Sequence, residues 1–169
     1  MSSSGCQSST LDAVDVALSI PFASRCTTLP WIDCPAGNHE NCMDVRFLNT
    51  DLEIESKSDL AKIVEEFGDD VIVLHHGERR GYQHASFEIA ITVECADETI
   101  NSFCALVENL REGVREIWDG CCSRIFDVGY ESGMSPLNFR SEIRAPTIQR
   151  VAAIGASIVI TIYPVSEES

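Results

Sequence analysis

The strongest constraint in the sequence is an alternation of apolar and polar residues between His84 and Val93. One set of alternate positions is Ala85, Phe87, Ile89, Ile91 and Val93, and the other is His84, Ser86, Glu88, Ala90 and Thr92. A period of two places successive side chains on opposite faces of a strand, so this pattern predicts a half-buried β-strand. Residues 48–55 show the same alternation and predict a second strand of this kind.

Helical periodicity separates these strands from others. Leu60, Ile63, Val64 and Phe67 form one apolar face, and Gly68 is suited to end that helix in a left-handed conformation. A longer helical pattern runs from Ile100 to Trp118. Further strands are predicted at 71–74, 124–130, 137–144 and 157–163, with a short helix that starts at 145–146.

The predicted order is β-α-β-β-α-β-β-α-β. Hairpin-like connections interrupt the strand–helix–strand units, so we expect an α+β fold with a mixed or antiparallel sheet. The helices should lie on one face of the sheet, in ferredoxin-like split βαβ units. We expect residues 42–169 to form this single α+β domain. Residues 1–41 are predicted to be a partly disordered N-terminal extension, in which 11–22 fits a strand or a helical turn equally well.

The charge of the chain restricts its partners. Twelve Lys and Arg residues face 27 Asp and Glu residues, which gives a formal net charge of -15. Phosphate backbones and anionic membrane surfaces would repel such a chain, so neither nucleic acid nor a membrane is an expected partner. Residues 1–10 lack the basic start and apolar core of a signal peptide, which predicts a cytoplasmic location with reduced thiols.

Several segments together resemble a known family. They are the helix 58–67, the strand 85–89 (ASFEI), residues 124–129 (RIFDVG) and the ending 154–163 (IGASIVITIY). In element order and in these patterns, residues 44–164 are similar to the bacterial domain of unknown function 4279. The resemblance implies the α+β fold, and it implies no activity or catalytic residue.

Two cysteine-containing groups are candidates for metal or redox chemistry. Cys26, Cys34, His39 and Cys42 have zinc-ligating side chains, but their spacing lacks a tight Cys-x-x-Cys pair, so an unstructured loop with incidental cysteines is the favoured interpretation. Cys121-Cys122 is a vicinal pair, for which we expect one thiol to be buried and the other exposed rather than a redox pair.

Catalytic signatures are weak throughout. His75, His76 and His84 would meet at the base of a hairpin and, with Glu88, could form a small acid–base or metal site. Adjacent strand residues point to opposite faces, however, so solvated histidines are the preferred interpretation. The sequence has no nucleophile elbow and no phosphate loop. We therefore expect no enzyme, no metal and no cofactor.

The face of the sheet opposite the helices is the predicted functional surface. Its expected partner-binding residues are His84, Glu88, Arg140, Glu142, Arg144, Thr161 and Tyr163, together with Ser86 and Val159. A polar face with an aromatic residue and arginines is suited to protein recognition, either of a partner or of a second copy in a homodimer. The sequence therefore predicts a non-enzymatic protein-interaction module that acts as a regulatory or neutralising partner. The alternative is a small-molecule-binding domain or enzyme with a site in a cleft beside the sheet.

Overall fold

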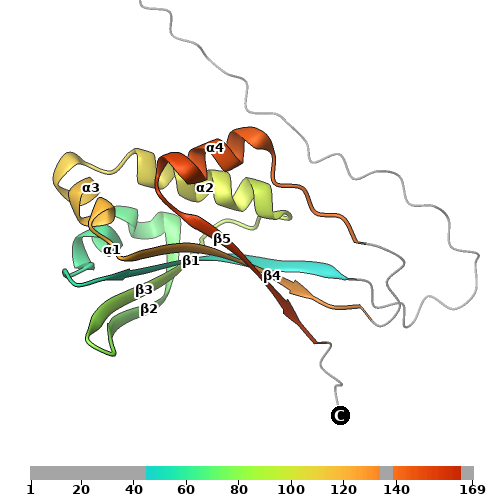
Figure 1. Ribbon diagram of the computed structural model, residues 1–169, viewed down its shortest axis with the longest axis horizontal. Coiled ribbons are helices and arrows are strands. Elements are labelled where there is room, and N and C mark those ends of the chain that lie inside the picture. The colour runs from blue at the N-terminus through green and yellow to red at the C-terminus, as the bar shows by residue number, and fades with distance from the viewer. Residues whose placement is uncertain (1–44, 134–138, 165–169) are drawn as a thin grey trace, which may run out of the picture. The chain divides into compact units, whose positions relative to one another are not determined.

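The computed structural model describes residues 45–133 and 139–164 (Figure 1). The strands are β1 (Arg46–Ser56), β2 (Val71–Arg79), β3 (Tyr82–Ile89), β4 (Ser123–Glu131) and β5 (Ser157–Tyr163). The helices are α1 (Ala61–Phe67), α2 (Ala96–Glu108), α3 (Glu112–Asp119) and α4 (Ala145–Ala153), with a 3-10 turn η1 (Gly68–Asp70).

The five strands form one mixed sheet in the order β2-β3-β1-β4-β5. All neighbours are antiparallel except β4 and β5, which are parallel. Strand β3 lies between β1 and β2, and β1 lies between β3 and β4, so α1 and the α2–α3 pair each connect strands that are not neighbours. This is the split βαβ arrangement, and the predicted α+β class is confirmed.

The helices cover one face of the sheet, as Figure 1 shows. The strands direct alternate residues to this face: Leu52 and Ile54 from β1, Phe87 from β3 and Phe126 from β4 are all fully buried. Helices α2 and α3 contribute residues at helical spacing, among them Ile100, Phe103, Val107, Val114 and Trp118. The core therefore lies between a single helical layer and a single sheet.

The single helix expected from Ile100 to Trp118 is divided into α2 and α3. Asn109 ends α2, and Arg111 has an extended backbone (φ -60°, ψ 150°) before α3 begins. The carboxylate of Glu66 accepts hydrogen bonds from the Arg111 backbone N–H at 2.6 Å and from its guanidinium Nε at 2.9 Å. This partner from α1 satisfies a backbone donor that a continuous helix would have used.

The strand expected at 137–144 is also wrong. Residues 139–144 have no regular structure, and 137–138 lie outside the described residues. The Phe139 ring packs edge-on against Tyr130 at a centroid distance of 5.1 Å, and the Tyr130 hydroxyl donates a hydrogen bond to Ser141 at 2.6 Å. Because Tyr130 points toward the helical side of β4, residues 139–144 cover that side instead of adding a strand.

A buried carboxylate fixes the start of α4. Asp97 of α2 is 2% exposed and accepts hydrogen bonds from the backbone N–H and Nε of Arg144 and from the Thr147 hydroxyl. Burial alone would raise the pKa of Asp97, but the bonds from Thr147 and Arg144 outweigh it and hold this pKa below its usual value. The network thus joins α2 to the segment that leads into α4.

Replacing Asp97 with Asn should lower the free energy of unfolding by about 3 kcal/mol at pH 7, because the Arg144 charge loses its buried partner. A depressed carboxyl pKa stabilises the fold above the unfolded value and loses this contribution as the pH falls through the folded value. The gap between variant and wild type in urea denaturation should therefore narrow below pH 3.8. Glu98→Gln in the same helical turn is the control, and an equal loss in both variants would contradict this role.

Candidate acidic interface on the open sheet face

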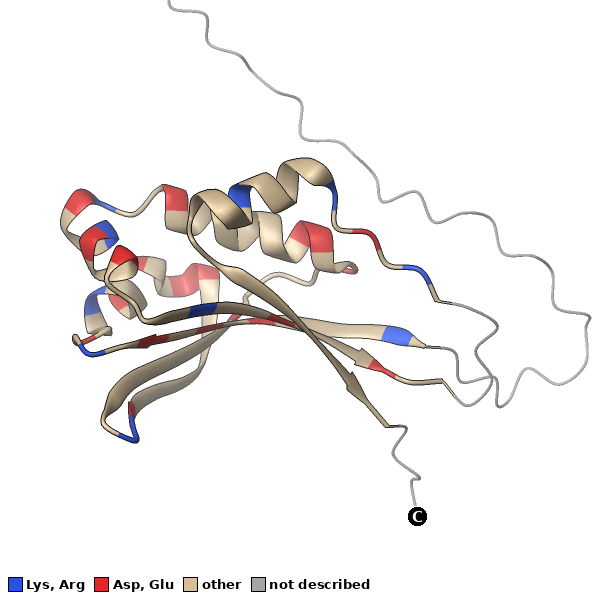
Figure 2. Cartoon of the chain, in the orientation of Figure 1, with Lys and Arg blue, Asp and Glu red and all other residues tan. Residues whose placement is uncertain are grey.

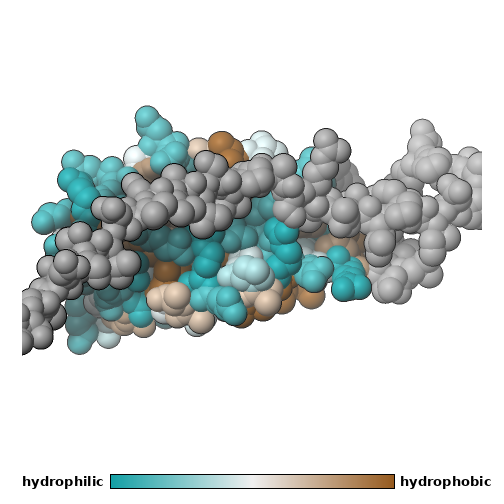
Figure 3. Space-filling model, turned by 90° about the horizontal axis from the view of Figure 1, so that it is seen from above, coloured by the Kyte–Doolittle hydropathy of each residue, from teal (hydrophilic) through white to brown (hydrophobic). Residues whose placement is uncertain are grey.

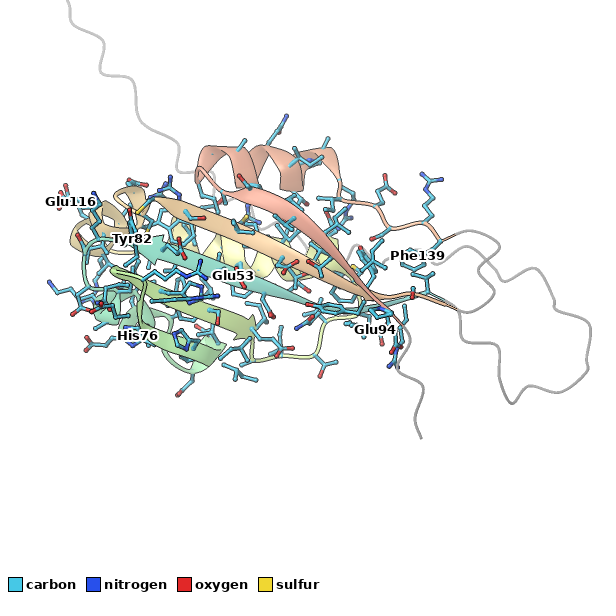
Figure 4. The ribbon with its side chains drawn as sticks, turned by 60° about the horizontal axis from the view of Figure 1, so that its bottom comes forward. Glu53, His76, Tyr82, Glu94, Glu116 and Phe139 are labelled. Carbon is cyan, nitrogen blue, oxygen red and sulfur yellow. The ribbon has the colours of Figure 1, made fainter. Side chains whose placement is uncertain are left out.

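The face of the sheet opposite the helices carries a group of carboxylates on its three inner strands. Asp51, Glu53 and Glu55 of β1 alternate with the buried residues, and Asp51 lies opposite Asp127 of β4. Glu88 of β3 is one position beyond the Leu52–Phe87 pair and so is the cross-strand neighbour of Asp51. Figure 4 brings this face forward and shows Glu53 near its middle. We name these five half-buried carboxylates, Asp51, Glu53, Glu55, Glu88 and Asp127, the acidic face.

No lysine or arginine lies among them. The neighbouring open-face positions on the same strands are Asn49, His84, Ser86, Ser123, Ile125 and Gly129. Arg46 lies at the far end of β1 and is paired with Glu131 at 2.7 Å. Basic and acidic residues are mixed on the helices, whereas the middle of the sheet is acidic (Figure 2). Like charges placed opposite one another on a sheet destabilise it, so this arrangement is not explained by folding.

Asp51 shows most clearly the effect of burial and of repulsion between the carboxylates. Burial, followed by repulsion from Glu88, Asp127 and Glu53, raises the pKa of Asp51 from 3.8 to about 6. The Asn49 side-chain amide donates a hydrogen bond to its Oδ1 at 2.9 Å, which holds the carboxylate in place. Near neutral pH, Asp51 is thus a positioned anion whose charge is costly until a cation approaches.

Two imidazoles lie at the β2–β3 end of the acidic face. His75 is opposite Ser86, and its ring centroid is 5.3 Å from that of His84. His84 is only 7% exposed, lies opposite Glu55, and its Nδ1 has no hydrogen-bond partner among the described residues. His76 is opposite Ala85 and therefore points to the other face. The histidines therefore point to opposite faces as expected, and His75 and His84 form a pair in which His84 is buried instead of solvated.

A cavity opens where β1 and β3 separate. The two strands are paired only from Leu52 to Ser56 of β1, and β3 ends at Ile89 instead of continuing to Val93 as the alternation predicted. The cavity of about 220 Å³ is lined by Phe47, Leu48, Asn49, Thr50, Ile72, Thr99 and residues 88–93. Thr50 is 1% exposed, and its hydroxyl has no hydrogen-bond partner in the described part of the chain. Glu88 lines this cavity and is also part of the acidic face, so the two adjoin.

The predicted residues of β5 do lie on the open face. The Thr161 hydroxyl donates a hydrogen bond to Asp127 Oδ1 at 2.6 Å. The Tyr163 ring lies over Gly129, where an added Cβ would be 3.5 Å from the ring and 2.9 Å from the Asn49 side chain. A glycine at 129 therefore allows Tyr163 and Asn49 to approach each other across β4. Together with His84 and Ser86, Thr161 and Tyr163 border the acidic face, of which the predicted residue Glu88 is itself a member.

Arg140, Glu142 and Arg144 are not on this face, contrary to the sequence-based expectation. All three lie in the irregular segment 139–144, which runs along the helical side. Arg144 is held by Asp97 of α2, with its Nε 2.6 Å from Asp97 Oδ2. The error follows from the strand predicted at 137–144, because its alternation would have directed these three side chains outward. The open face is consequently more acidic than expected.

The signal for the acidic residues was present in the sequence. Asp51, Glu53 and Glu55 are the polar half of the 48–55 alternation, and Asp127 has the same role in 124–130. What the sequence lacked was strand order. Only the placement of β1 between β3 and β4 brings these residues opposite Glu88 and Asp127.

Cysteine and metal chemistry have little support in the described residues. Cys121 is buried and Cys122 exposed, as expected, and burial raises the pKa of both Cys104 and Cys121 to about 11, which disfavours the reactive thiolate. No group of three or more potential ligands in residues 45–133 and 139–164 is arranged to hold a metal ion. The candidate ligands Cys26, Cys34, His39 and Cys42 lie outside the described residues. Among the described helices, none is long and apolar enough to cross a membrane.

Comparison of the chain with protein-family models, with curated protein sequences and with solved structures finds no significant match.

Replacing Asp51 with Asn should stabilise the protein at high pH and not at low pH. Because the pKa of Asp51 is raised in the folded state, the folded protein binds the Asp51 proton more tightly than the unfolded chain does. The ionised carboxyl therefore destabilises the fold above about pH 6. This destabilisation disappears as the pH falls toward 3.8 and the carboxyl is protonated. After a discount for solvent screening, Asp51→Asn should raise the free energy of unfolding at pH 8 by about 1 kcal/mol. Urea denaturation at pH 8 and pH 4.5 measures it.

Glu116→Gln on exposed helix α3 removes one charge at a site without these neighbours and serves as the control. A gain from Asp51→Asn that is equal at both pH values, or matched by the control, would contradict the repulsion described for Asp51.

Proposed function

We propose that this domain is a non-enzymatic protein-interaction module that binds a basic protein partner through the acidic face. The observation that carries the proposal is the set of five carboxylates, without a neighbouring lysine or arginine, on a sheet face that no described helix covers. Such an arrangement costs stability in the free protein, and lysine or arginine side chains of a partner would recover that cost on binding.

The charge of Asp51 supports a specific binding mode. Burial and then repulsion from its acidic neighbours raise the pKa of this carboxylate, so a partner's ammonium or guanidinium group near Asp51, Glu88 and Asp127 would be strongly favoured. The rigid sheet holds these carboxylates in place before binding, which lowers the entropic cost of association. Tyr163 and Ile125 at the border supply apolar contact area, as interface residues commonly do.

In this proposal the domain acts by covering a basic surface of its partner, as a regulatory or neutralising protein in the cytoplasm. Mimicry of a polyanion would be one physical route, because a row of carboxylates can occupy the basic surface by which a partner binds nucleic acid. We further propose that the chain belongs to the domain of unknown function 4279 family, on the segments described above.

Neutralising part of the acidic face tests the proposal. Glu53→Gln, Glu55→Gln and Asp127→Asn combined should weaken binding of a short oligolysine peptide about tenfold or more at low salt, as measured by isothermal titration calorimetry. In NMR titrations of the wild type, the peptide should shift amide signals of β1, β3 and β4. Binding should weaken with added salt, since exposed charges are screened.

The matched control removes the same number of charges from the helices: Glu65→Gln, Glu112→Gln and Glu116→Gln. A general attraction of oligolysine to the net charge of -15 would weaken equally in both triple variants, and that result would refute the proposed surface.

The cavity between β1 and β3 supports a second candidate, a small-molecule-binding function. Its volume of about 220 Å³ suits a small polar ligand, and the buried Thr50 hydroxyl offers an unused hydrogen-bonding group. Thermal-shift screening with small amines, polyols and carboxylates tests it. A saturable stabilisation that Thr50→Val abolishes would favour this candidate, and no stabilisation by any compound would reject it for these ligand classes.

A further inference from the structure

The C-terminal unit formed by α4 and β5 is almost free of charge. Between Ala145 and Pro164 the only charged residue is Arg150, in a chain of which 23% is charged. Its guanidinium points to α2, where it makes two hydrogen bonds to the Glu108 carboxylate, at 2.9 and 2.8 Å, and one to Asn101 at 2.7 Å. The outward surface of this unit therefore carries no uncompensated charge.

Strand β5 forms one edge of the sheet, and within the described residues only β4 is paired with it. Its sequence, SIVITIY, has no proline and no charge, and its pairing with β4 is regular. Its side chains are also exposed: Val159 by 41%, Ile160 by 61%, Ile162 by 65% and Tyr163 by 48%. A regular apolar edge of this kind is a template for pairing with another strand.

The opposite edge also exposes apolar side chains, at Ile72, Val73 and Leu74, but it differs in charge and in the regularity of its pairing. Strand β2 carries Glu78 and Arg79, two adjacent histidines, and a register shift between Val73 and His75. Charges and irregular pairing are the usual devices that prevent an edge from recruiting further strands. Strand β2 is thus protected against pairing with a further strand, whereas β5 is not.

Apolar surface continues from β5 to the helical side. Ile160 and Ile162 have the same orientation as the half-buried Ile158 but extend beyond the cover of α4, and Ile148 of α4 is 50% exposed. Seen from the helical side, hydrophobic and pale residues gather along the lower margin of the molecule (Figure 3), which is the side where α4 and β5 lie foremost in Figure 1. Exposed apolar residues gathered at one edge of a sheet favour an interface there.

We infer that β5 pairs with β5 of a second copy of this chain, antiparallel and about a two-fold axis, to form a continuous ten-stranded sheet. With the axis at Ile160, Ile158 of one copy lies opposite Ile162 of the other, and Val159 lies opposite Thr161. The strand is therefore complementary to itself, with β-branched residues paired along most of its length.

The charges favour a second copy of the chain, and not a basic protein, as the partner of β5. Two chains of net charge -15 repel each other, so a second copy is tolerated only where the contact is free of acidic residues, and β5 meets that condition. A basic partner gains nothing from an uncharged edge and is attracted to the acidic face instead. Edge pairing keeps both acidic faces on the same side of the joined sheet, where two neighbouring copies would bind a multivalent basic partner with increased avidity.

Analytical ultracentrifugation of the full chain tests the inference. The wild type should dimerise, and added salt should strengthen the dimer because it screens the repulsion between copies, the opposite of its effect on oligolysine binding. Ile160→Lys and Ile162→Lys should each raise the dimer dissociation constant about tenfold or more, since a lysine on the edge must be desolvated on pairing. Both sites are exposed, so circular dichroism and thermal unfolding of the monomer should be preserved.

Ile72→Lys is the matched control: it places the same substitution at a 51% exposed isoleucine of the other edge strand and should leave the dimer intact. Amide hydrogen exchange should show concentration-dependent protection in β5 and none in β2. A wild type that stays monomeric at the highest concentration, as it would if β5 were covered within its own chain, overturns the inference. So does a dimer that survives both β5 substitutions. Neither result affects oligolysine binding, so the two proposals fail independently.

Discussion

One-sided burial is the constraint on which the rest of the structure depends. A single layer of helices covers one face of the pleated sheet, so the core residues of the strands must point to that face and the alternate residues to the other. In β1 the rule places Leu52 and Ile54 in the core and, by the same alternation, aligns Asp51, Glu53 and Glu55 on the open face. The core and the acidic face are therefore two consequences of one pattern.

Ion pairs are distributed unequally between the two sides of the sheet. On the helical side three carboxylates that connect elements have partners: Asp97 is held by Arg144 and Thr147, Glu108 by Arg150, and Glu66 by Arg111. On the open face Asp51, Glu88 and Asp127 face one another, and burial and repulsion raise the pKa of Asp51. Carboxylates that hold the helices together are thus paired with arginines. Carboxylates on the open face, where a partner can reach them, have no basic residue beside them.

The sequence predicted those features that depend on local periodicity. The alternation in 48–55 and 84–93 identified β1 and β3, and Gly68, with a φ of +49°, ends α1 as expected. The errors occurred where a distant residue overrides the local pattern. Residues 139–144 alternate like a strand, but Asp97 and Tyr130 bind them to the helical side. Glu66 accepts the Arg111 N–H and so permits the break between α2 and α3. For the same reason His84, Glu88, Thr161 and Tyr163, which are on regular strands, lie on the expected face, whereas Arg140, Glu142 and Arg144 do not.

Titration of the Asp51 carboxyl carbon by NMR, in the free protein and with oligolysine, tests directly whether the acidic face holds uncompensated charge that a basic partner relieves. Burial and repulsion within the acidic face predict a midpoint of about 6 in the free protein, and a lower midpoint in the complex because bound ammonium groups favour the charged form. A midpoint near the ordinary 3.8 in the free protein, unchanged by the peptide, would contradict the claim that the acidic face holds unpaired, mutually repelling charge.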